Sequence, residues 1–192
     1  MISNQHKCFF IHIPKTGGGT IDNVLSVGDD TYYENIKMYH YNCNQWREKY
    51  PTEWKTYFKF TFVRNPWDLR VSYYFYNKTQ GTFRGKHARN KSFSEYVKFY
   101  SAKSKKKTLI AKPQMYFLGG NVNNVDFIGR FENLQEDFDI VCDKIGIPKQ
   151  KLPHKNKSQH KHYTEYYDDE TREIVAEYYA KDIEYFNYKF GE

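Results

Sequence analysis

The stretch KCFFIHIPKTGGGT, residues 7–20, sets the expectation for the whole chain. Five of the six residues in Cys8–Ile13 are apolar or aromatic, and such a short run is typical of a buried strand. Because Pro14 has no N–H to give to a sheet ladder, we expect the strand to end there. The apolar spacing after the glycines predicts an amphipathic helix over about 20–27. The stretch therefore predicts a strand, a glycine-rich turn and a helix in succession.

The turn between this strand and this helix has the composition of an anion-binding loop. Glycines let backbone N–H groups turn toward a ligand, and the positive end of a helix dipole favours phosphate-like groups. The loop matches neither GxxxxGK[ST], since its lysine precedes the glycines, nor GxGxxG. A plain connection is the alternative reading, and the lysine at the strand end favours the anion site. The candidate binding residues of the loop are Lys15, Thr16, Gly17, Gly18, Gly19 and Thr20.

Length and composition limit the class of protein. A chain of 192 residues is long enough to bury a core, and we expect a single domain over residues 1–192. With 19 Tyr and 15 Phe, that core should be rich in aromatic side chains, which argues against a disordered chain. A formal net charge of +7 favours anionic partners.

The cysteines and the hydropathy of the sequence indicate in which cellular compartment the protein is expected. Three scattered cysteines are too few for a disulfide framework or a zinc site. The sequence has no signal-peptide pattern and no long apolar run. The expected setting is therefore cytoplasmic, with no membrane span.

A second strand-to-helix corner lies further along the chain. Residues 57–63, YFKFTFV, predict another buried strand, and the helix expected over Trp67–Asn77 follows the sequence Arg-Asn-Pro. Residues 125–129, VDFIG, predict a third strand. Repeated strand-to-helix units indicate an α/β fold with a central parallel sheet flanked by helices. We also expect helices over 43–50, 92–101, 114–118, 133–145 and 168–180, and loops over 78–91 and 149–164.

The second corner carries another pair of anion-binding candidates. Arg64 follows the predicted strand, and Ser72 lies about two turns into the helix. From these places a guanidinium and a hydroxyl can converge on one phosphate. A surface ion pair is the alternative reading for Arg64.

Together the two corners resemble a known family. HIPKTGGGT and FVRNPWDLRVSYY are similar to the paired cofactor motifs of the sulfotransferases that use 3′-phosphoadenosine-5′-phosphosulfate (PAPS), with the closest likeness in the carbohydrate branch of the heparan sulfate 2-O-sulfotransferases. The resemblance implies a P-loop-like three-layer fold. It also implies that the lysine loop holds the 5′-phosphosulfate and the Arg64–Ser72 pair the 3′-phosphate, so that both corners serve one nucleotide. The family often has a hydroxyl residue where Gly19 stands.

Two further segments extend the resemblance. FIGRFENL, residues 127–134, is similar to a family segment on the adenine side, which implies a cofactor role for Arg130. The region that precedes YTEYYDDET resembles the family's C-terminal closing loop. The candidate cofactor residues there are Lys155, Asn156 and Ser158.

The implied reaction is in-line sulfuryl transfer that leaves 3′,5′-adenosine bisphosphate (PAP) and requires no metal. Lys15 would stabilise the departing phosphate. The resemblance implies that His40, in KMYHYN, is the general base, and an imidazole suits that role. An ordinary loop histidine is the alternative. Weaker candidates for the base are Glu34, Glu48 and His87, whereas His12 is expected to be a core histidine or a neighbour of the cofactor.

The acceptor is a hydroxyl group, and the family likeness favours an oligosaccharide or polysaccharide. The basic segment 78–91, with Arg84 and Arg89, could line an acceptor groove or form plain surface.

Two other functions are alternatives to sulfuryl transfer. A nucleotide-dependent kinase would need a Mg²⁺-binding aspartate after a strand, and the sequence offers no convincing one. A nucleic-acid binder would carry a basic, aromatic face, whereas these anion-binding residues stand at strand ends.

Overall fold

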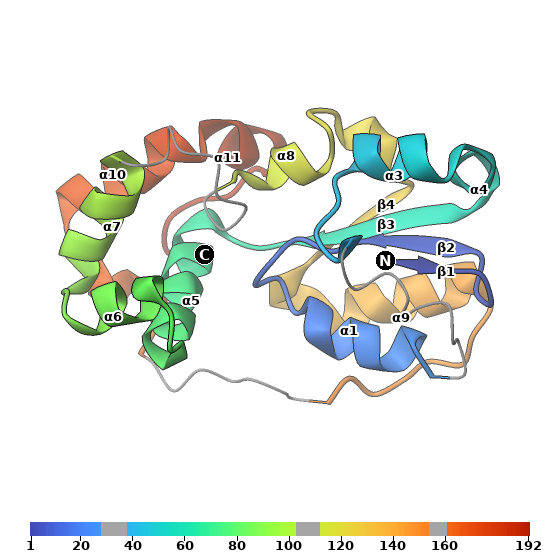
Figure 1. Ribbon diagram of the computed structural model, residues 1–192, viewed down its shortest axis with the longest axis horizontal. Coiled ribbons are helices and arrows are strands. Elements are labelled where there is room, and N and C mark those ends of the chain that lie inside the picture. The colour runs from blue at the N-terminus through green and yellow to red at the C-terminus, as the bar shows by residue number, and fades with distance from the viewer. Residues whose placement is uncertain (28–37, 103–111, 154–160) are drawn as a thin grey trace. The chain divides into compact units, whose positions relative to one another are not determined.

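The computed structural model of the chain describes residues 1–27, 38–102, 112–153 and 161–192, and the chain divides into two compact units. The first, which we call the sheet unit, combines Met1–Val63 with Gln114–Lys155. The second, the helical unit, combines Arg64–Pro113 with Asn156–Glu192. Figure 1 shows the strands in the former and the long helix α5 in the latter.

Four strands form the sheet, in the order β1-β2-β3-β4. Strands β2, β3 and β4 are parallel, and β1 pairs with β2 in the antiparallel sense. Phe60 on β3 lies opposite Phe10 on one side and Phe127 on the other. The carboxyl ends of three strands therefore share one edge of the sheet, which is where parallel α/β sheets bind ligands. The strands are β1 (Ile2–Ser3), β2 (Cys8–Ile11), β3 (Phe58–Val63) and β4 (Phe127–Arg130).

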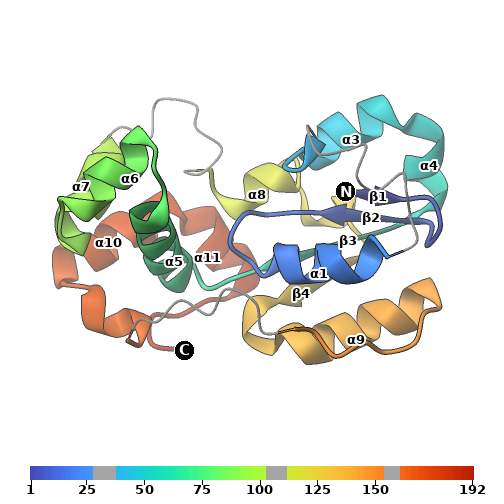
Figure 2. The same cartoon turned by 60° about the horizontal axis from the view of Figure 1, so that its bottom comes forward.

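Helices cover both faces of this sheet, as Figures 1 and 2 show. Because strand side chains alternate between faces, Cys8 and Phe10 join the core under α1 and α9. Phe9 turns to the other face, where its ring lies 5.7 Å from Trp46 and 5.1 Å from Trp54. The three-layer α/β architecture is thus confirmed. The helices of this unit are α1 (Gly18–Leu25), α3 (Cys43–Lys49), α4 (Pro51–Thr56), α8 (Gln114–Phe117) and α9 (Leu134–Ile145), with 3-10 helices η3 (Val122–Asn124) and η4 (Phe131–Asn133).

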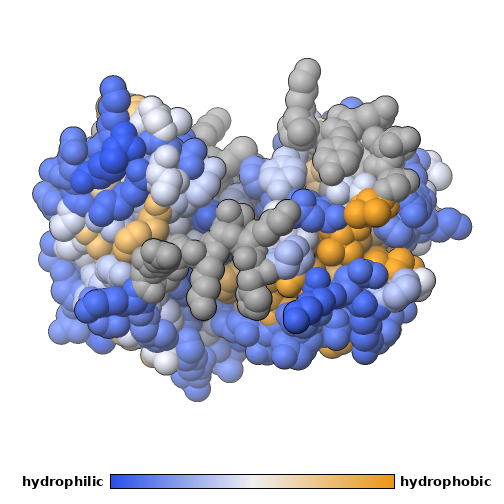
Figure 3. Space-filling view, turned by 90° about the horizontal axis from the view of Figure 1, so that it is seen from below, coloured by the Kyte–Doolittle hydropathy of each residue, from blue (hydrophilic) through white to orange (hydrophobic). Residues whose placement is uncertain are grey.

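Apolar side chains also reach the surface of the sheet unit. Figure 3 shows the face that α1 and α9 cover, where apolar atoms appear among mostly hydrophilic ones. Val27, just after α1, is 71% exposed, and Ile140, on α9, is 42% exposed. Exposed apolar side chains are common on protein surfaces.

The helical unit is built around α5, most of which is buried. The ring of Tyr74 contacts Phe93 and Tyr96 of α7, and the ring of Trp67 packs edge-on against Phe190. Aromatic side chains therefore fill this core, as the composition predicts. The elements are α5 (Pro66–Thr79), α6 (Phe83–Arg89), α7 (Phe93–Ala102), η5 (Tyr163–Tyr166), α10 (Asp169–Tyr178) and α11 (Ala180–Phe186).

One predicted loop is a helix instead. Segment 78–91 contains the end of α5 and the whole of α6. The hydroxyl of Thr82 accepts a hydrogen bond from the N–H of Gly85 at 3.3 Å and caps α6. Gly85 and Ala88 are buried, so α6 packs through small residues that give no apolar pattern in the sequence.

Candidate functional site

The loop after β2 has an unusual backbone at its lysine. Lys15 has a φ of 71°, in the left-handed region that residues with a side chain rarely adopt. Thr16 next to it is buried, and its hydroxyl donates to the carbonyl of Ile13 at 2.8 Å. That bond closes the turn, so the strained lysine sits in a fixed loop. Strained backbone of this kind clusters at ligand-binding sites.

The start of α1 presents its backbone to this loop. Gly17 is the N-cap, with a φ of 85°, and no side chain in the described part of the chain caps the helix. The first N–H groups of α1 therefore lack the usual side-chain acceptor, and the helix dipole makes this end attractive to an anion. A Cβ atom at Gly18 would lie 2.1 Å from Nε2 of His12, whereas one at Gly19 would meet nothing within 4 Å. The close approach of the His12 ring thus requires glycine at position 18.

Four side chains form a polar cluster behind the loop. His12 Nδ1 lies 3.2 Å from Oδ2 of Asp22, although the two are not aligned for a hydrogen bond. The hydroxyl of Tyr39 donates to the same oxygen. His40 Nδ1 lies 3.1 Å from the carbonyl oxygen of His12, and the two imidazole rings are 5.0 Å apart. The cluster therefore joins the end of β2, helix α1 and the turn at residues 38–40.

These contacts define the protonation of His40. A carbonyl oxygen can only accept, so Nδ1 of His40 carries the proton and Nε2 keeps a lone pair. Burial and, to a smaller extent, the neighbouring His12 lower the pKa of His40 to about 4. At neutral pH the imidazole is uncharged and can accept a proton at Nε2. Burial and the nearby Asp22 raise the pKa of Tyr39 well above its ordinary value, so its hydroxyl remains a donor.

The second predicted motif lies in the helical unit. Arg64 directly follows β3, is 7% exposed, and its Nε donates to Oδ2 of Asp68 at 2.8 Å. The ion pair expected as the alternative reading thus exists, but it is buried and orients the guanidinium. Ser72 lies on α5 and is also buried. Asn65 caps α5 by accepting from the N–H of Trp67 at 3.1 Å, which fixes the corner.

The other predicted site residues lie near the lysine loop or outside the described residues. Arg130 ends β4, at the same edge of the sheet as the lysine loop, and its N–H donates to Asp137 at 2.5 Å. The hydroxyl of Thr20 donates to the carbonyl of Pro153 at 3.4 Å, which ties α1 to the start of the predicted closing segment. Four candidates lie outside the described residues: Glu34, Lys155, Asn156 and Ser158.

The two weaker candidates for the base that lie in the described residues belong to other elements. His87 lies on α6 with its ring 3.8 Å from that of Phe99, in the helical unit, and Glu48 is exposed on α3. Arg89 donates to the carbonyls of Lys78 and Gln80, at 2.9 and 2.7 Å. Its guanidinium therefore closes the connection between α5 and α6.

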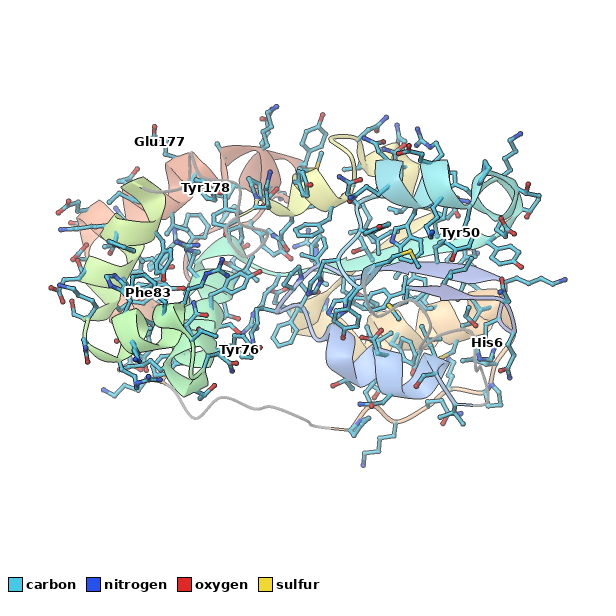
Figure 4. The ribbon with its side chains drawn as sticks, viewed as in Figure 1. His6, Tyr50, Tyr76, Phe83, Glu177 and Tyr178 are labelled. Carbon is cyan, nitrogen blue, oxygen red and sulfur yellow. The ribbon has the colours of Figure 1, made fainter. Side chains whose placement is uncertain are left out.

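Beside this connection, two aromatic side chains are exposed. Figure 4 labels Tyr76 on α5 and Phe83 on α6, which are 44% and 75% exposed. Arg84, next to Phe83, is half-buried. This part of the helical unit therefore combines exposed aromatic rings with basic side chains.

Sequence reasoning missed Asp22 and Tyr39. Neither belongs to a recognisable motif, and their contact joins residues 17 positions apart. The available signal was the position of Asp22, an acidic residue one turn after the glycines on the predicted helix.

Within residues 1–27, 38–102, 112–153 and 161–192, no group of three or more His, Cys, Asp or Glu side chains could hold a metal ion. None of the described helices is long and apolar enough to cross a membrane.

The chain was compared with known protein families, proteins and structures, and the family match includes residues of both units. The family model described as "Sulfotransferase family" matches residues 1–189. A protein of Archaeoglobus fulgidus named "Uncharacterized protein" is 38% identical over 99 residues, which are 49% of this chain and 72% of that protein. No solved structure matches the chain significantly.

Proposed function

We propose that this chain, which belongs to the sulfotransferase family, moves a sulfuryl group from PAPS to a hydroxyl of an oligosaccharide or polysaccharide. Membership of the family establishes sulfuryl transfer in general, and the donor and acceptor are our proposal. PAPS, when bound, supplies a sulfuryl group attached to a phosphate that can leave. The likeness of the two motifs to those of the heparan sulfate 2-O-sulfotransferases supports a carbohydrate acceptor.

One observation carries the proposal: Lys15 stands in a left-handed turn between a buried strand and the start of α1. The residues present fit a phosphosulfate, since α1 begins at glycines whose N–H groups no side chain caps in the described structure. Lys15 contributes an ammonium that can donate to the phosphate oxygen as negative charge develops there. Backbone groups hold the anion, and the lysine stabilises the charge that builds up during transfer.

We assign the 3′-phosphate to Arg64 and Ser72. Arginine offers a rigid fork of donors that matches phosphate geometry. The bond to Asp68 holds Arg64 in one orientation, so less freedom is lost when an anion binds. Arg130 is assigned to the adenine side, and Lys155, Asn156 and Ser158 to a closing segment, on the motif resemblance alone.

We assign the general base to His40. Its Nδ1 faces the carbonyl of His12, which leaves Nε2 to accept the proton of an acceptor hydroxyl. A pKa of about 4 keeps the ring unprotonated at neutral pH. Negative charge from a donor bound nearby would raise the pKa of this imidazole, which makes it a stronger base during the reaction.

Transfer of radiolabelled sulfate from PAPS tests the proposal. The acceptor panel should contain glycans, small alcohols, phenols and tyrosine peptides, with wild-type protein and Lys15→Ala side by side. We expect labelled glycan with the wild type and about a 100-fold or greater loss with the variant. Label on phenols or peptides alone would overturn the carbohydrate assignment.

A thermal-shift panel separates the competing functions, since a ligand that binds the native state stabilises it. Stabilisation by PAP and not by ATP with Mg²⁺ or by oligonucleotides is the expected pattern. Stabilisation by ATP with Mg²⁺ alone would favour a kinase. Stabilisation by oligonucleotides alone would favour a nucleic-acid binder.

A further inference from the structure

We infer that Asp22 and Tyr39 are positioning residues, whose mutual hydrogen bond holds His40 in the orientation and tautomer that a base requires. The catalytic part of this inference rests on the proposed function, whereas the geometric part does not. Tyr39 directly precedes His40 in the turn, and its hydroxyl donates to Oδ2 of Asp22 on α1. The bond therefore attaches the turn that carries the base to the helix that begins at the anion-binding loop.

Asp22 acts on both sides of His40. On one side it accepts the hydroxyl proton of Tyr39, the residue next to the base. On the other side, Oδ2 of Asp22 lies 3.2 Å from Nδ1 of His12. The carbonyl oxygen of His12 in turn accepts the hydrogen bond from Nδ1 of His40. The carboxylate is largely shielded from water, with a side-chain exposure of 13%. One largely shielded carboxylate thus contacts both the residue next to the base and the residue whose carbonyl faces the base.

Ring packing completes the arrangement. The His12 ring lies edge-on to Tyr39 at 4.2 Å, and the rings of Tyr39 and His40 are 4.8 Å apart. On its other side His12 approaches Gly18, where no Cβ atom would fit. His12 is therefore confined between α1 and the turn, so its carbonyl is a fixed reference point for His40. The hydroxyl of Tyr39 sets the distance between turn and helix, and loss of it would let His40 rotate away.

Four variants isolate the hydrogen bond. Tyr39→Phe removes the hydroxyl and keeps the ring. Asp22→Ala removes the acceptor, whereas Asp22→Asn keeps an oxygen that can accept from Tyr39 and removes only the charge. Tyr41→Phe is the matched control, because it makes the same chemical change two positions further on, where the hydroxyl has no hydrogen bond within the described residues.

The first test needs no turnover. Nitrogen-15 NMR of the histidine rings reports which nitrogen of His40 carries the proton. We expect one tautomer, protonated at Nδ1, in the wild type, Tyr41→Phe and Asp22→Asn. Tyr39→Phe and Asp22→Ala should show a mixture of the two tautomers. Identical His40 signals in the wild type and Tyr39→Phe would overturn the inference, as would a wild-type His40 protonated at Nε2.

The second test is kinetic. We expect Tyr39→Phe and Asp22→Ala to lower kcat about tenfold or more, with PAP affinity within about twofold of wild type, because a misplaced base affects the reaction and not donor binding. Asp22→Asn should recover most of kcat, and Tyr41→Phe should match the wild type. A Tyr39→Phe variant with wild-type kcat would refute the positioning role while leaving the proposed function intact. If the wild type transfers no sulfate from PAPS, the proposed function fails, and the NMR comparison still decides whether Asp22 and Tyr39 hold His40.

Discussion

Lys15 combines the role proposed for it in transfer with a backbone conformation that costs stability. Its φ of 71° is unfavourable for any residue with a Cβ atom. We predict that Lys15→Gly and Lys15→Ala both abolish transfer, and that Lys15→Gly is the more stable of the two by about 1 kcal/mol. Urea unfolding of both variants measures the difference. Equal free energies of unfolding would show that the backbone at this position is not strained.

Two adjacent glycines of the loop should respond in opposite ways. Gly18→Ala would place a Cβ atom against the His12 ring, and we predict a loss of about 1–3 kcal/mol in the free energy of unfolding. Gly19→Ala meets open space in the first turn of a helix, and we predict a gain of about 0.5–1 kcal/mol. Thermal or urea unfolding distinguishes the two. A stable Gly18→Ala protein would mean that His12 does not occupy this position.

The lowered pKa of His40 predicts a pH dependence of stability. In the unfolded chain His40 has its ordinary pKa of 6.5, and in the folded protein the pKa is about 4. Between these values the unfolded state binds more protons, so stability falls as pH falls through this range. We predict that His40→Gln has a flatter profile than the wild type there. The measurement is urea unfolding at several pH values, and parallel profiles would contradict the burial of His40.

Sequence alone located the residues that stand at strand ends. Lys15 and Arg64 could be predicted because a buried run and a proline mark the end of each strand. The contacts of His40 could not, since they depend on Asp22 and Tyr39, which meet only when the turn folds onto α1. No periodic pattern encodes that contact.

Sequence reasoning missed α6, as it missed α4 and α11, and the cap of α6 offers a test. Thr82→Ala removes the hydroxyl that accepts from Gly85, and we predict a loss of about 1 kcal/mol in stability. Thr79→Ala is the control, since its exposed hydroxyl makes only local contacts at the end of α5, where it donates to the carbonyl of Tyr76 and accepts from Nε2 of Gln80. We expect that variant to change stability by less than about 0.5 kcal/mol. Equal effects at the two positions would argue against a capped helix over Phe83–Arg89.

The elements that could be predicted are those with a strong apolar pattern. Strands β2, β3 and β4 and helix α9 fall close to their expected ranges, because each buries a continuous or periodic apolar surface. Helix α6 could not be predicted because its buried residues are small, its one large apolar residue, Phe83, is exposed, and its other positions are basic. Strand β1 has only two residues and pairs with β2 across a turn, so it is too short to produce a pattern.

The molecule as a whole distributes its two motifs between two units, with the lysine loop in the sheet unit and Arg64 and Ser72 in the helical unit. The sulfotransferase family match spans both. A nucleotide that requires both motifs should therefore lose affinity when either is altered. Because Arg64 is assigned to the 3′-phosphate, its removal should affect only ligands that carry this group.

Calorimetric titration of PAP and of adenosine 5′-monophosphate into wild type, Lys15→Ala and Arg64→Ala is the most direct test. We predict that the wild type binds PAP about 10- to 150-fold more tightly than the monophosphate, since a charged hydrogen-bonded contact contributes about 1.5–3 kcal/mol. Arg64→Ala should abolish this preference, and Lys15→Ala should weaken both ligands. A wild type that binds the two nucleotides equally, or an Arg64→Ala variant that keeps the preference, would contradict the assignment of this chain as a PAPS-dependent sulfotransferase.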